Sequence, residues 1–285
     1  MMMLTHKLSR RTVLAGAATL MLAATASRAL AAVMPQLSAK DGSFDRVKAA
    51  KILKFGTSND QPYSFVNVET GKIEGIDAEM MLAILDKLGI PDHEATQIEF
   101  NGLIPSLLAS RMDVIADAMY ITEKRQKVIS FSEGWYQYGE ALLVREGNPK
   151  GLHALEDLRN GAKVGSYLGT VYLDWLGQIE GAEVMSYPDA ASALEDMRAG
   201  RLDAVVIDAP VAGYALSRNP KYKNAFEIVA DYKPREVGTI GAGFRKEDEA
   251  LREAFNWALK ELKAEGTDLA ILKKWGLSEA NRTLG

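Results

Sequence analysis

Arg125 is the residue whose type and position point most directly to ligand chemistry. It follows Thr122, a natural helix N-cap, by three positions, which places it in the first turn of a predicted helix. A fixed cation there faces the positive end of the helix macrodipole, where carboxylates are favoured. Because a guanidinium offers paired donors, we interpret Arg125 as a clamp for a ligand carboxylate. The alternative is a solvated surface arginine paired with Glu123 or another acid.

Three further positions would complete the recognition of a zwitterion. Gly169-Thr170 opens a predicted helix whose free backbone N–H groups can share the carboxylate with Arg125, although Thr170 also suits an ordinary N-cap. Asp208 ends a predicted strand and can receive a ligand ammonium, or can cap the helix over residues 209–216 that includes Pro210. Asp60, in the loop after another strand, can act in the same way.

Aromatic side chains stand at or just past predicted strand ends. Tyr63, Phe100 and Tyr120 could stack on a ligand or face a cationic nitrogen, each contributing about 0.5–2 kcal/mol. Packing in the core is the alternative, and for Phe100 alone it is at least as good an explanation. An anion clamp opposite two carboxylates, with aromatic walls between them, fits a small zwitterion.

Signatures of catalysis are missing from the sequence. After the first 31 residues the histidines are His93 and His153, in turn-like surroundings without the spacing of a metal site. Gly241-Ala242-Gly243 lacks the third glycine of a dinucleotide motif, and neither a P-loop nor a G-x-S-x-G elbow occurs. Cysteine is absent, which excludes disulfides, thiolate metal sites and cysteine nucleophiles. We therefore expect a binding protein with no catalytic residue, metal or cofactor.

An alternation of strands and helices must position these groups. This rhythm predicts an α/β protein with mostly parallel sheets and flanking helices. Strands are expected over residues 52–56, 96–100, 114–116, 138–144, 163–165, 183–186, 204–207 and 239–244. Helices are expected over residues 44–50, 78–88 (with Asp77 as N-cap), 103–111, 155–159, 170–176, 190–199, 209–216, 246–264 and 267–275.

A faint repeat divides the chain into two similar halves. Ala109-Ser110-Arg111-Met112-Asp113 and Ala199-Gly200-Arg201-Leu202-Asp203 lie ninety positions apart, each between a helix and a strand. Ala118 and Asp208 then occupy equivalent strand ends, so Ala118 joins the candidate ligand-binding residues. We expect lobe 1 to comprise residues 46–145 and 239–285 and lobe 2 residues 146–238, with two strands crossing between them. Such a hinge permits bending while restricting twist.

The first 31 residues have the pattern of an export signal. Lys7, Arg10, Arg11 and Arg28 occur there without an acid, around an apolar run and before a small-x-small cleavage site. The arginine pair favours the twin-arginine route, while the Sec route remains an alternative. Residues 32–45 are expected to be a flexible leader. Removal of the signal changes the net charge from −4 to −8. We therefore expect a soluble periplasmic monomer that does not bind nucleic acid.

From about residue 44 to residue 277, the chain resembles the polar amino-acid class of periplasmic solute-binding proteins, family 3, which serve ABC importers. The resemblance implies a type II fold of two closing lobes and a cognate ABC permease in the inner membrane as partner. It also implies that Arg125 and Gly169-Thr170 hold the α-carboxylate, Asp208 the α-amine, and Asp60, Tyr63 and Phe100 the side-chain end. The matching motifs are Gly75-Ile76-Asp77, Leu103-Ile104-Pro105-Ser106-Leu107, Arg111-Met112-Asp113-Val114, Ile121-Thr122-Glu123-Lys124-Arg125, Phe131-Ser132, Gly169-Thr170 and Gly200-Arg201-Leu202-Asp203-Ala204 with Asp208.

Tyr120 departs from that pattern, because binders of this family often have a small hydroxyl residue there. In this respect the chain is similar to ectoine and hydroxyectoine binders, whose aromatic cage would map onto Tyr63, Phe100 and Tyr120. Asp208 fits a free-amine amino acid better. The ligand stays open between a polar or cationic amino acid and a cyclic or methylated zwitterion such as ectoine or a betaine. A further alternative is enzymatic, since the family has given rise to periplasmic prephenate or arogenate dehydratases, which would need a cleft acid.

Overall fold

A computed structural model describes residues 33–283. The predicted export signal lies outside the described residues. Between residues 33 and 283, no helix has the length and apolar character needed to cross a bilayer. Elements of the first part of the chain are α1 (Ser43–Ala50), β1 (Ile52–Thr57), β2 (Phe65–Val66), β3 (Ile73–Glu74), α2 (Ile76–Leu88), β4 (Asp92–Gln97), the 3-10 turn η1 (Phe100–Gly102), α3 (Leu103–Leu108), β5 (Val114–Ile115), α4 (Glu123–Gln126) and β6 (Ser130–Phe131).

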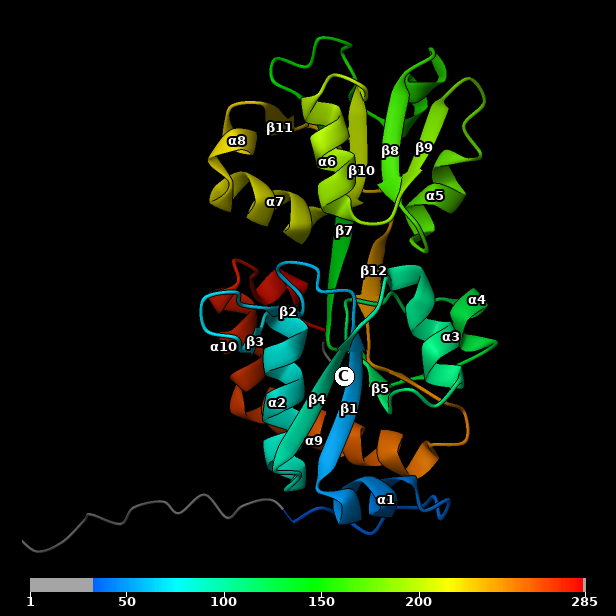
Figure 1. The fold of residues 1–285 in the computed structure, drawn as a ribbon, viewed down its shortest axis with the longest axis vertical. Helices are drawn as coiled ribbons and strands as arrows, with labels where there is room; N and C mark the ends of the chain where they lie inside the picture. The colour runs from blue at the N-terminus through cyan, green and yellow to red at the C-terminus, as the bar shows by residue number, and fades with distance from the viewer. Residues whose placement is uncertain (1–32, 284–285) are drawn as a thin grey trace, which may run out of the picture. The chain divides into compact units, whose positions relative to one another are not determined.

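The middle of the chain builds a second group of strands and helices, and the last part returns to the first group (Figure 1). The middle elements are β7 (Tyr136–Arg145), η2 (Leu155–Arg159), β8 (Lys163–Tyr167), α5 (Val171–Leu176), β9 (Glu183–Tyr187), α6 (Ala190–Arg198), β10 (Ala204–Asp208), α7 (Ala209–Arg218), α8 (Pro220–Lys223) and β11 (Phe226–Ile228). The last elements are β12 (Val237–Ile240), β13 (Gly243–Phe244), α9 (Glu249–Glu265), α10 (Thr267–Lys274) and η3 (Glu279–Asn281).

Each lobe is organised around one mixed sheet. The first sheet has the order β4-β1-β5-β13-β6, in which β1 pairs in parallel with β4 and β5 while β13 pairs antiparallel with β5 and β6. The second has the order β11-β7-β10-β8-β9, in which β8 pairs in parallel with β9 and β10 while β7 is antiparallel to β10 and β11. The predicted α/β class is confirmed, but both sheets are mixed and not mostly parallel as expected. The antiparallel pairs arise where the chain leaves one lobe or returns to it.

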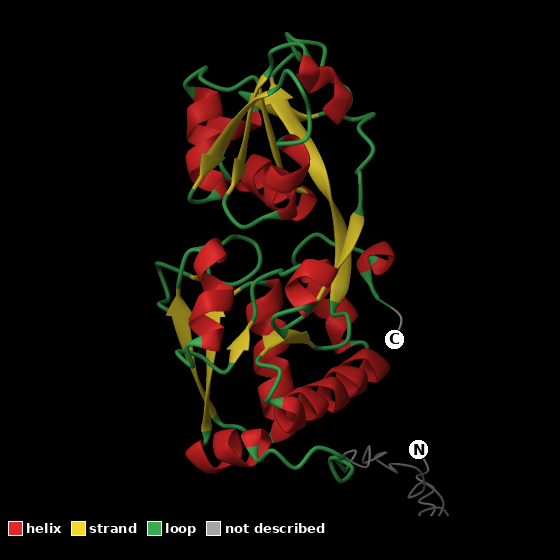
Figure 2. Ribbon diagram, turned by 90° about the vertical axis from the view of Figure 1, so that its right-hand side faces the viewer, coloured by secondary structure: helices red, strands yellow, loops and turns green. Residues whose placement is uncertain are grey.

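Two antiparallel strands connect the lobes. Residues 136–139 of β7 pair with β12, while residues 140–144 of the same strand pair with β10 in the second sheet. Figure 2 shows this ribbon running between the two groups of elements. The two-strand connection predicted from the sequence is thus present. Because β7 itself belongs to both regions, the lobe boundaries at 145–146 and 238–239 stay a proposal.

The predicted internal repeat is confirmed by hydrogen bonds. The Asp113 carboxylate accepts the backbone N–H of Lys54 at 3.1 Å, and the Asp203 carboxylate accepts that of Lys163 at 2.9 Å. In each lobe the aspartate thus joins the start of its own strand to a neighbouring parallel strand. The same hydrogen bond therefore positions β5 in the first lobe and β10 in the second, and site residues follow or end these strands.

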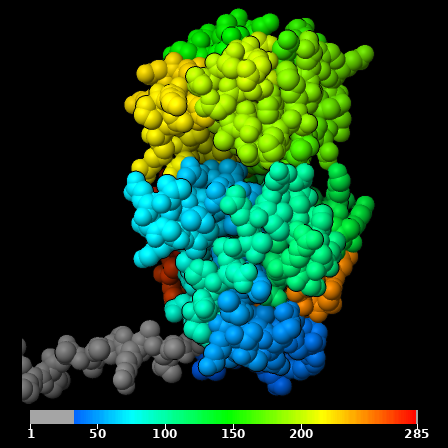
Figure 3. Space-filling view, in the orientation of Figure 1, coloured from blue at the N-terminus to red at the C-terminus, as the bar shows by residue number. Residues whose placement is uncertain are grey.

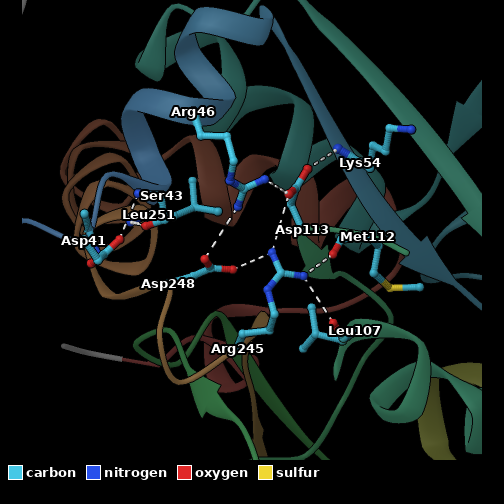
Figure 4. Close-up of polar contacts among 11 residues, drawn as sticks. Asp41, Ser43, Arg46, Lys54, Leu107, Met112, Asp113, Arg245, Asp248 and Leu251 are labelled. Atoms are coloured by element: carbon cyan, nitrogen blue, oxygen red, sulfur yellow. Dashed lines mark hydrogen bonds and ion pairs between the residues drawn. The ribbon is translucent and has the colours of Figure 1, made fainter. Parts of the chain in front are cut away.

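A buried ion-pair cluster fixes the returning segment to the first lobe (Figure 4). Arg245, which is 5% exposed, pairs with Asp248 and lies 3.5 Å from Asp113. Its guanidinium also donates to the carbonyl oxygens of Leu107 and Met112. Because an uncompensated buried charge is costly, this cluster holds the segment between β13 and α9 against the turn before β5.

Several predicted boundaries were wrong for local reasons. Gly75, and not Asp77, is the N-cap of α2, because the buried Asp77 carboxylate is used elsewhere. The strand expected at residues 96–100 is β4, which spans Asp92–Gln97. Its residues are mostly polar and only partly buried, so the sequence pattern did not indicate where the strand begins. Residues 155–159 form a 3-10 turn, and residues 239–244 are divided between β12 and β13. In the expected leader, Ser38 and Ala39 donate to the Glu253 carboxylate of α9.

Replacement of Gly238 in β12 by alanine should destabilise the protein. A Cβ there would lie 2.3 Å from Cε2 of Tyr120, so the Tyr120 ring or the hinge strand must move. We expect a loss of about 1–3 kcal/mol in the free energy of unfolding, measured by urea denaturation. Gly213→Ala in α7 is the control, because its Cβ meets nothing within 4 Å and alanine favours a helix by about 1 kcal/mol. A midpoint for Gly238→Ala at or above that of the wild type would contradict this packing.

Candidate ligand-binding site

A pocket with an empty volume of about 320 Å³ lies between the two lobes. Eight of the nine residues predicted from the sequence line it: Asp60, Tyr63, Phe100, Ala118, Tyr120, Arg125, Thr170 and Asp208. The ninth, Gly169, accepts a hydrogen bond from Arg125. Residues that sequence reasoning missed are Asp117, Tyr138, Tyr167, Val171 and Tyr172. The lobes lie against each other on the face shown in Figure 3.

Arg125 reaches from the first lobe to the second. Its Nη1 donates to the Tyr120 carbonyl at 2.8 Å and its Nη2 to the Gly169 carbonyl at 3.0 Å. The guanidinium carbon lies 5.4 Å from the centroid of the Phe100 ring. Among the described residues it forms no ion pair, so the alternative pairing with Glu123 is wrong. Since a guanidinium has five N–H donors, three remain for a ligand.

The local reason given for the position of Arg125 was only partly correct. Thr122 is the N-cap of α4, and its Oγ1 accepts the N–H of Arg125 at 3.2 Å, as predicted. However, α4 has only four residues, so its macrodipole is too small to support the argument. The side chain is placed instead by the two carbonyl oxygens and by Phe100.

The Gly169-Thr170 turn packs closely against the first lobe. Gly169 has φ of +87°, and a Cβ there would lie 2.8 Å from Cα of Asn101. Thr170 Oγ1 donates to the Tyr167 carbonyl at 2.8 Å and does not cap α5. The turn therefore needs glycine both for its backbone conformation and for the close approach of the lobes.

Asp208 lies at the centre of a group of tyrosines. Its side chain, 4% exposed, makes no capping bond to α7, which excludes the simple N-cap alternative. Instead it accepts the hydroxyl of Tyr167 at 2.8 Å and the hydroxyl of Tyr172. A carboxylate has about four acceptor sites, so it retains capacity for a ligand N–H.

Tyr120 connects this group to the hinge. Its hydroxyl donates to the Tyr138 carbonyl in β7 at 2.8 Å and lies 3.2 Å from the oxygen of the Tyr172 hydroxyl, whose single hydrogen is donated to Asp208. Its ring covers Gly238 in the partner hinge strand. Tyr120 thus contacts the pocket, both hinge strands and a tyrosine of the second lobe.

The aromatic walls extend beyond the predicted three residues. Tyr63 stacks on Tyr138 with centroids 5.6 Å apart, and Phe100 meets Tyr167 edge to face at 6.1 Å. The Tyr63 hydroxyl is buried and has no hydrogen-bond partner among the described residues. Because a buried hydroxyl without a partner is costly, a polar ligand group beside Tyr63 would be favoured.

Buried carboxylates dominate the electrostatics of the site. Burial raises the pKa of Asp60 well above its usual value, and the charges of Asp117, Asp208 and Asp189 raise it further. Burial raises the pKa of Asp117 to about 7, against hydrogen bonds from Ser58 and Thr57. The pKa of Asp208 is also raised by burial, against its tyrosine partners. Within residues 33–283, one guanidinium, Arg125, lines the pocket with these three aspartates.

Asp77 supports the site from behind. One carboxylate oxygen accepts the Tyr136 hydroxyl at 2.6 Å and the other accepts the N–H of Ala118. Ala118 has φ of +47°, and its carbonyl accepts the Tyr138 hydroxyl at 3.2 Å. Burial raises the pKa of Asp77 to about 7. The only signal in the sequence was its position in the Gly75-Ile76-Asp77 motif, which was given a capping role.

Contacts outside the pocket also join the lobes. Lys124 pairs with Asp174 of α5 at 2.9 Å. Tyr214 of α7 packs against Phe65 of β2 and Trp275 after α10, with centroids 6.4 and 6.2 Å apart. The lobes are thus in contact on more than one side of the pocket.

The pocket offers carboxylates, phenols and one guanidinium, which suit the binding of a charged small molecule. No cluster of three or more His, Cys, Asp or Glu side chains that could hold a metal ion occurs within residues 33–283. This composition supports recognition through charge and hydrogen bonds.

Comparison with known proteins places this geometry in a family. A model of bacterial extracellular solute-binding proteins, family 3, matches residues 53–278. The L-cystine-binding protein TcyJ of Escherichia coli is 30% identical over 238 residues, covering 83% of this chain and 87% of that protein. An ancestral arginine-binding protein bound to arginine is similar in structure, with a TM-score of 0.73 and 33% identity over 79% of this chain and 98% of that one.

A second solved structure is that of an amino acid-binding protein related to an enzyme. The ancestral amino acid-binding protein AncCDT-1, described as a precursor of cyclohexadienyl dehydratase, has a TM-score of 0.74 and 28% identity, covering 82% of this chain and 99% of that one. The family match spans most of the chain, and these neighbours have the two-lobed fold. The chain therefore belongs to the bacterial extracellular solute-binding proteins, family 3, and has their two-lobed type II fold.

Proposed function

We propose that this chain is the periplasmic binding component of an ABC importer and that it captures an amino acid with a second cationic group in its side chain. The observation that carries the proposal is the charge of the pocket, where three aspartates face one arginine. Because the charged form of a buried carboxyl group is disfavoured without a partner, a pocket with three carboxyl groups and one guanidinium favours a ligand that brings more positive than negative charge.

The two ends of the α-amino acid group would be held from different lobes. Arg125 has three free N–H donors beside the Gly169-Thr170 turn and would bind the α-carboxylate. Asp208, already oriented by Tyr167 and Tyr172, would accept the α-ammonium. Because Arg125 comes from the first lobe and Asp208 from the second, a ligand held by both would stabilise the closed arrangement.

The side chain would extend toward Asp60. Its carboxylate lines the pocket and forms no ion pair with a described residue. A distal ammonium, guanidinium or imidazolium would supply the missing partner and lower the pKa of Asp60. The rings of Tyr63 and Tyr138 would provide an apolar wall for the side chain.

This charge balance also ranks the alternatives. Ectoine and betaines carry one positive and one negative group, so they would pair with Arg125 and one aspartate but leave Asp60 without a partner. They remain a weaker alternative, supported by Tyr120 and its neighbours. A dehydratase would require one of the buried aspartates to act as an acid on a bound substrate, and turnover of prephenate or arogenate by the purified protein would establish that reaction.

Arg125→Ala should remove ligand binding while leaving the fold intact. A ligand at 100 times its dissociation constant should stabilise the wild type by about 2.7 kcal/mol, and the variant should lose that gain because the carboxylate has no other cation in the pocket. Thermal-shift assays with L-arginine, L-lysine and L-histidine measure the effect. Arg111→Ala is the control, because Arg111 is exposed in the turn before β5 and should not change the shift. A full shift in Arg125→Ala would remove Arg125 from the site.

The ligand-free protein should lose stability as the pH rises from about 5 to about 8. Asp117 has a pKa of 3.8 when unperturbed and about 7 in the folded protein, so the folded state binds more protons in that window. Stability therefore falls with rising pH until Asp117 is ionised. The melting temperature should follow this trend, and Asp117→Asn should reduce the slope without abolishing it, because the raised pKa values of Asp60, Asp77 and Asp208 act in the same direction. His153, whose pKa is raised by Asp231, adds a slope of the same sign, so the comparison is made in a His153→Gln background. An equal slope with and without Asp117 would contradict the assignment.

A further inference from the structure

A groove lies next to the ligand pocket at Asp60. Asp60 lines both hollows. The groove is formed by Asn59, Asp60 and Gln61 of the first lobe and by residues of α6, α7 and α8 of the second. A ligand whose first end lies at Arg125 and Asp208 and whose second end meets Asp60 would therefore reach the border of the groove.

Arg218 supplies a second guanidinium at this groove. It lines the groove at the end of α7, and its guanidinium carbon lies 5.7 Å from the centroid of the Tyr214 ring. Neither Arg218 nor Asp60 forms an ion pair with a described residue. A carboxylate from the first lobe and a guanidinium from the second thus face the same groove, and each is available to a ligand.

The pocket and the groove, which meet at Asp60, have matching components. At the pocket end, Arg125 lies over Phe100 and faces Asp208 of the opposite lobe. At the groove end, Arg218 lies over Tyr214 and faces Asp60 of the opposite lobe. Each has one guanidinium on an aromatic ring and one carboxylate. In the pocket the guanidinium comes from the first lobe and the carboxylate from the second, and in the groove the reverse holds. That pair of groups is the complement of an α-ammonium and an α-carboxylate.

The length of α7 indicates how far apart the two heads would lie. Asp208 precedes the ten-residue helix and Arg218 is its last residue, so their Cα atoms are separated by about 15 Å along the axis. The long Arg218 side chain leans toward the helix N-terminus and shortens that distance. Two heads joined by a chain of several atoms would fit this separation.

We propose that the preferred ligand has two α-amino acid heads, one bound by Arg125 and Asp208 and the other by Asp60 and Arg218. This inference rests on the proposed function and specifies its ligand class as diamino dicarboxylic acids. The distal ammonium meets Asp60, as in a cationic amino acid, and the distal carboxylate meets Arg218. Since each head is held from both lobes, the ligand joins them at two places.

Matched ligand pairs test the role of the second carboxylate. LL-2,6-diaminopimelate differs from L-lysine, and L-cystine from S-(2-aminoethylthio)-L-cysteine, by one carboxylate at the distal end. Isothermal titration of the mature protein should show that the two-headed member of at least one pair binds about tenfold more tightly. Arg218→Gln should remove this advantage, because it weakens the binding of the two-headed ligand and does not weaken that of the one-headed ligand.

Lys221→Gln is the control, because it removes the same charge from the neighbouring helix α8 at a position that does not line the groove. It should keep the advantage of the two-headed ligand. The inference is overturned if one-headed ligands bind and neither two-headed ligand binds more tightly, or if Arg218→Gln leaves the advantage intact. The first outcome leaves the proposed function standing. Failure of all four ligands, together with L-arginine and L-histidine, would overturn the proposed function itself.

Discussion

The buried surplus of negative charge between the lobes is the constraint on which the rest of the structure depends. Asp60, Asp117 and Asp208 line a pocket that, within residues 33–283, contains a single guanidinium. Burial disfavours their charged forms, and in the ligand-free protein this shows as raised pKa values. A cationic ligand offsets that cost when the lobes are closed, so electrostatics favours both its binding and the closed arrangement.

The tyrosines connect this charge to the hinge. Asp208 accepts from Tyr172, the Tyr172 hydroxyl oxygen lies 3.2 Å from that of Tyr120, and Tyr120 donates to the carbonyl of Tyr138 in β7. These contacts run from the second lobe through the first lobe to a strand shared by both. A change at Asp208 therefore alters groups that contact the moving part of the fold, in addition to those that contact the ligand. The Tyr120 ring can lie there because position 238 is glycine.

Much of the fold and site could be predicted because it depends on local patterns. Asp208 is the last residue of a strand, as its pattern indicated, and the repeat around Asp113 and Asp203 indicated two similar lobes. Arg125 was placed correctly for a partly wrong reason, since α4 is a single turn and interlobe carbonyl contacts position the side chain.

The missed residues depend on contacts between segments far apart in the sequence. Tyr138 lies in a strand whose apolar sequence is typical of the protein core. Tyr172 lies in a helix, and which side of that helix faces the pocket depends on how the two lobes meet. Asp77 looked like a cap because its true partners, Tyr136 and Ala118, are distant in the chain. Local periodicity carries no information about which residues of two lobes will face each other.

Proton release on ligand binding tests the electrostatic account most directly. Isothermal titration of the wild-type protein with L-lysine or L-arginine near pH 7, in buffers with different ionisation enthalpies, gives the number of protons exchanged. If a bound cation lowers the pKa values of Asp60 and Asp117, protons must be released, and the release should diminish in Asp117→Asn. Binding that releases no protons, or takes them up, would contradict the claim that the ligand neutralises buried carboxylates.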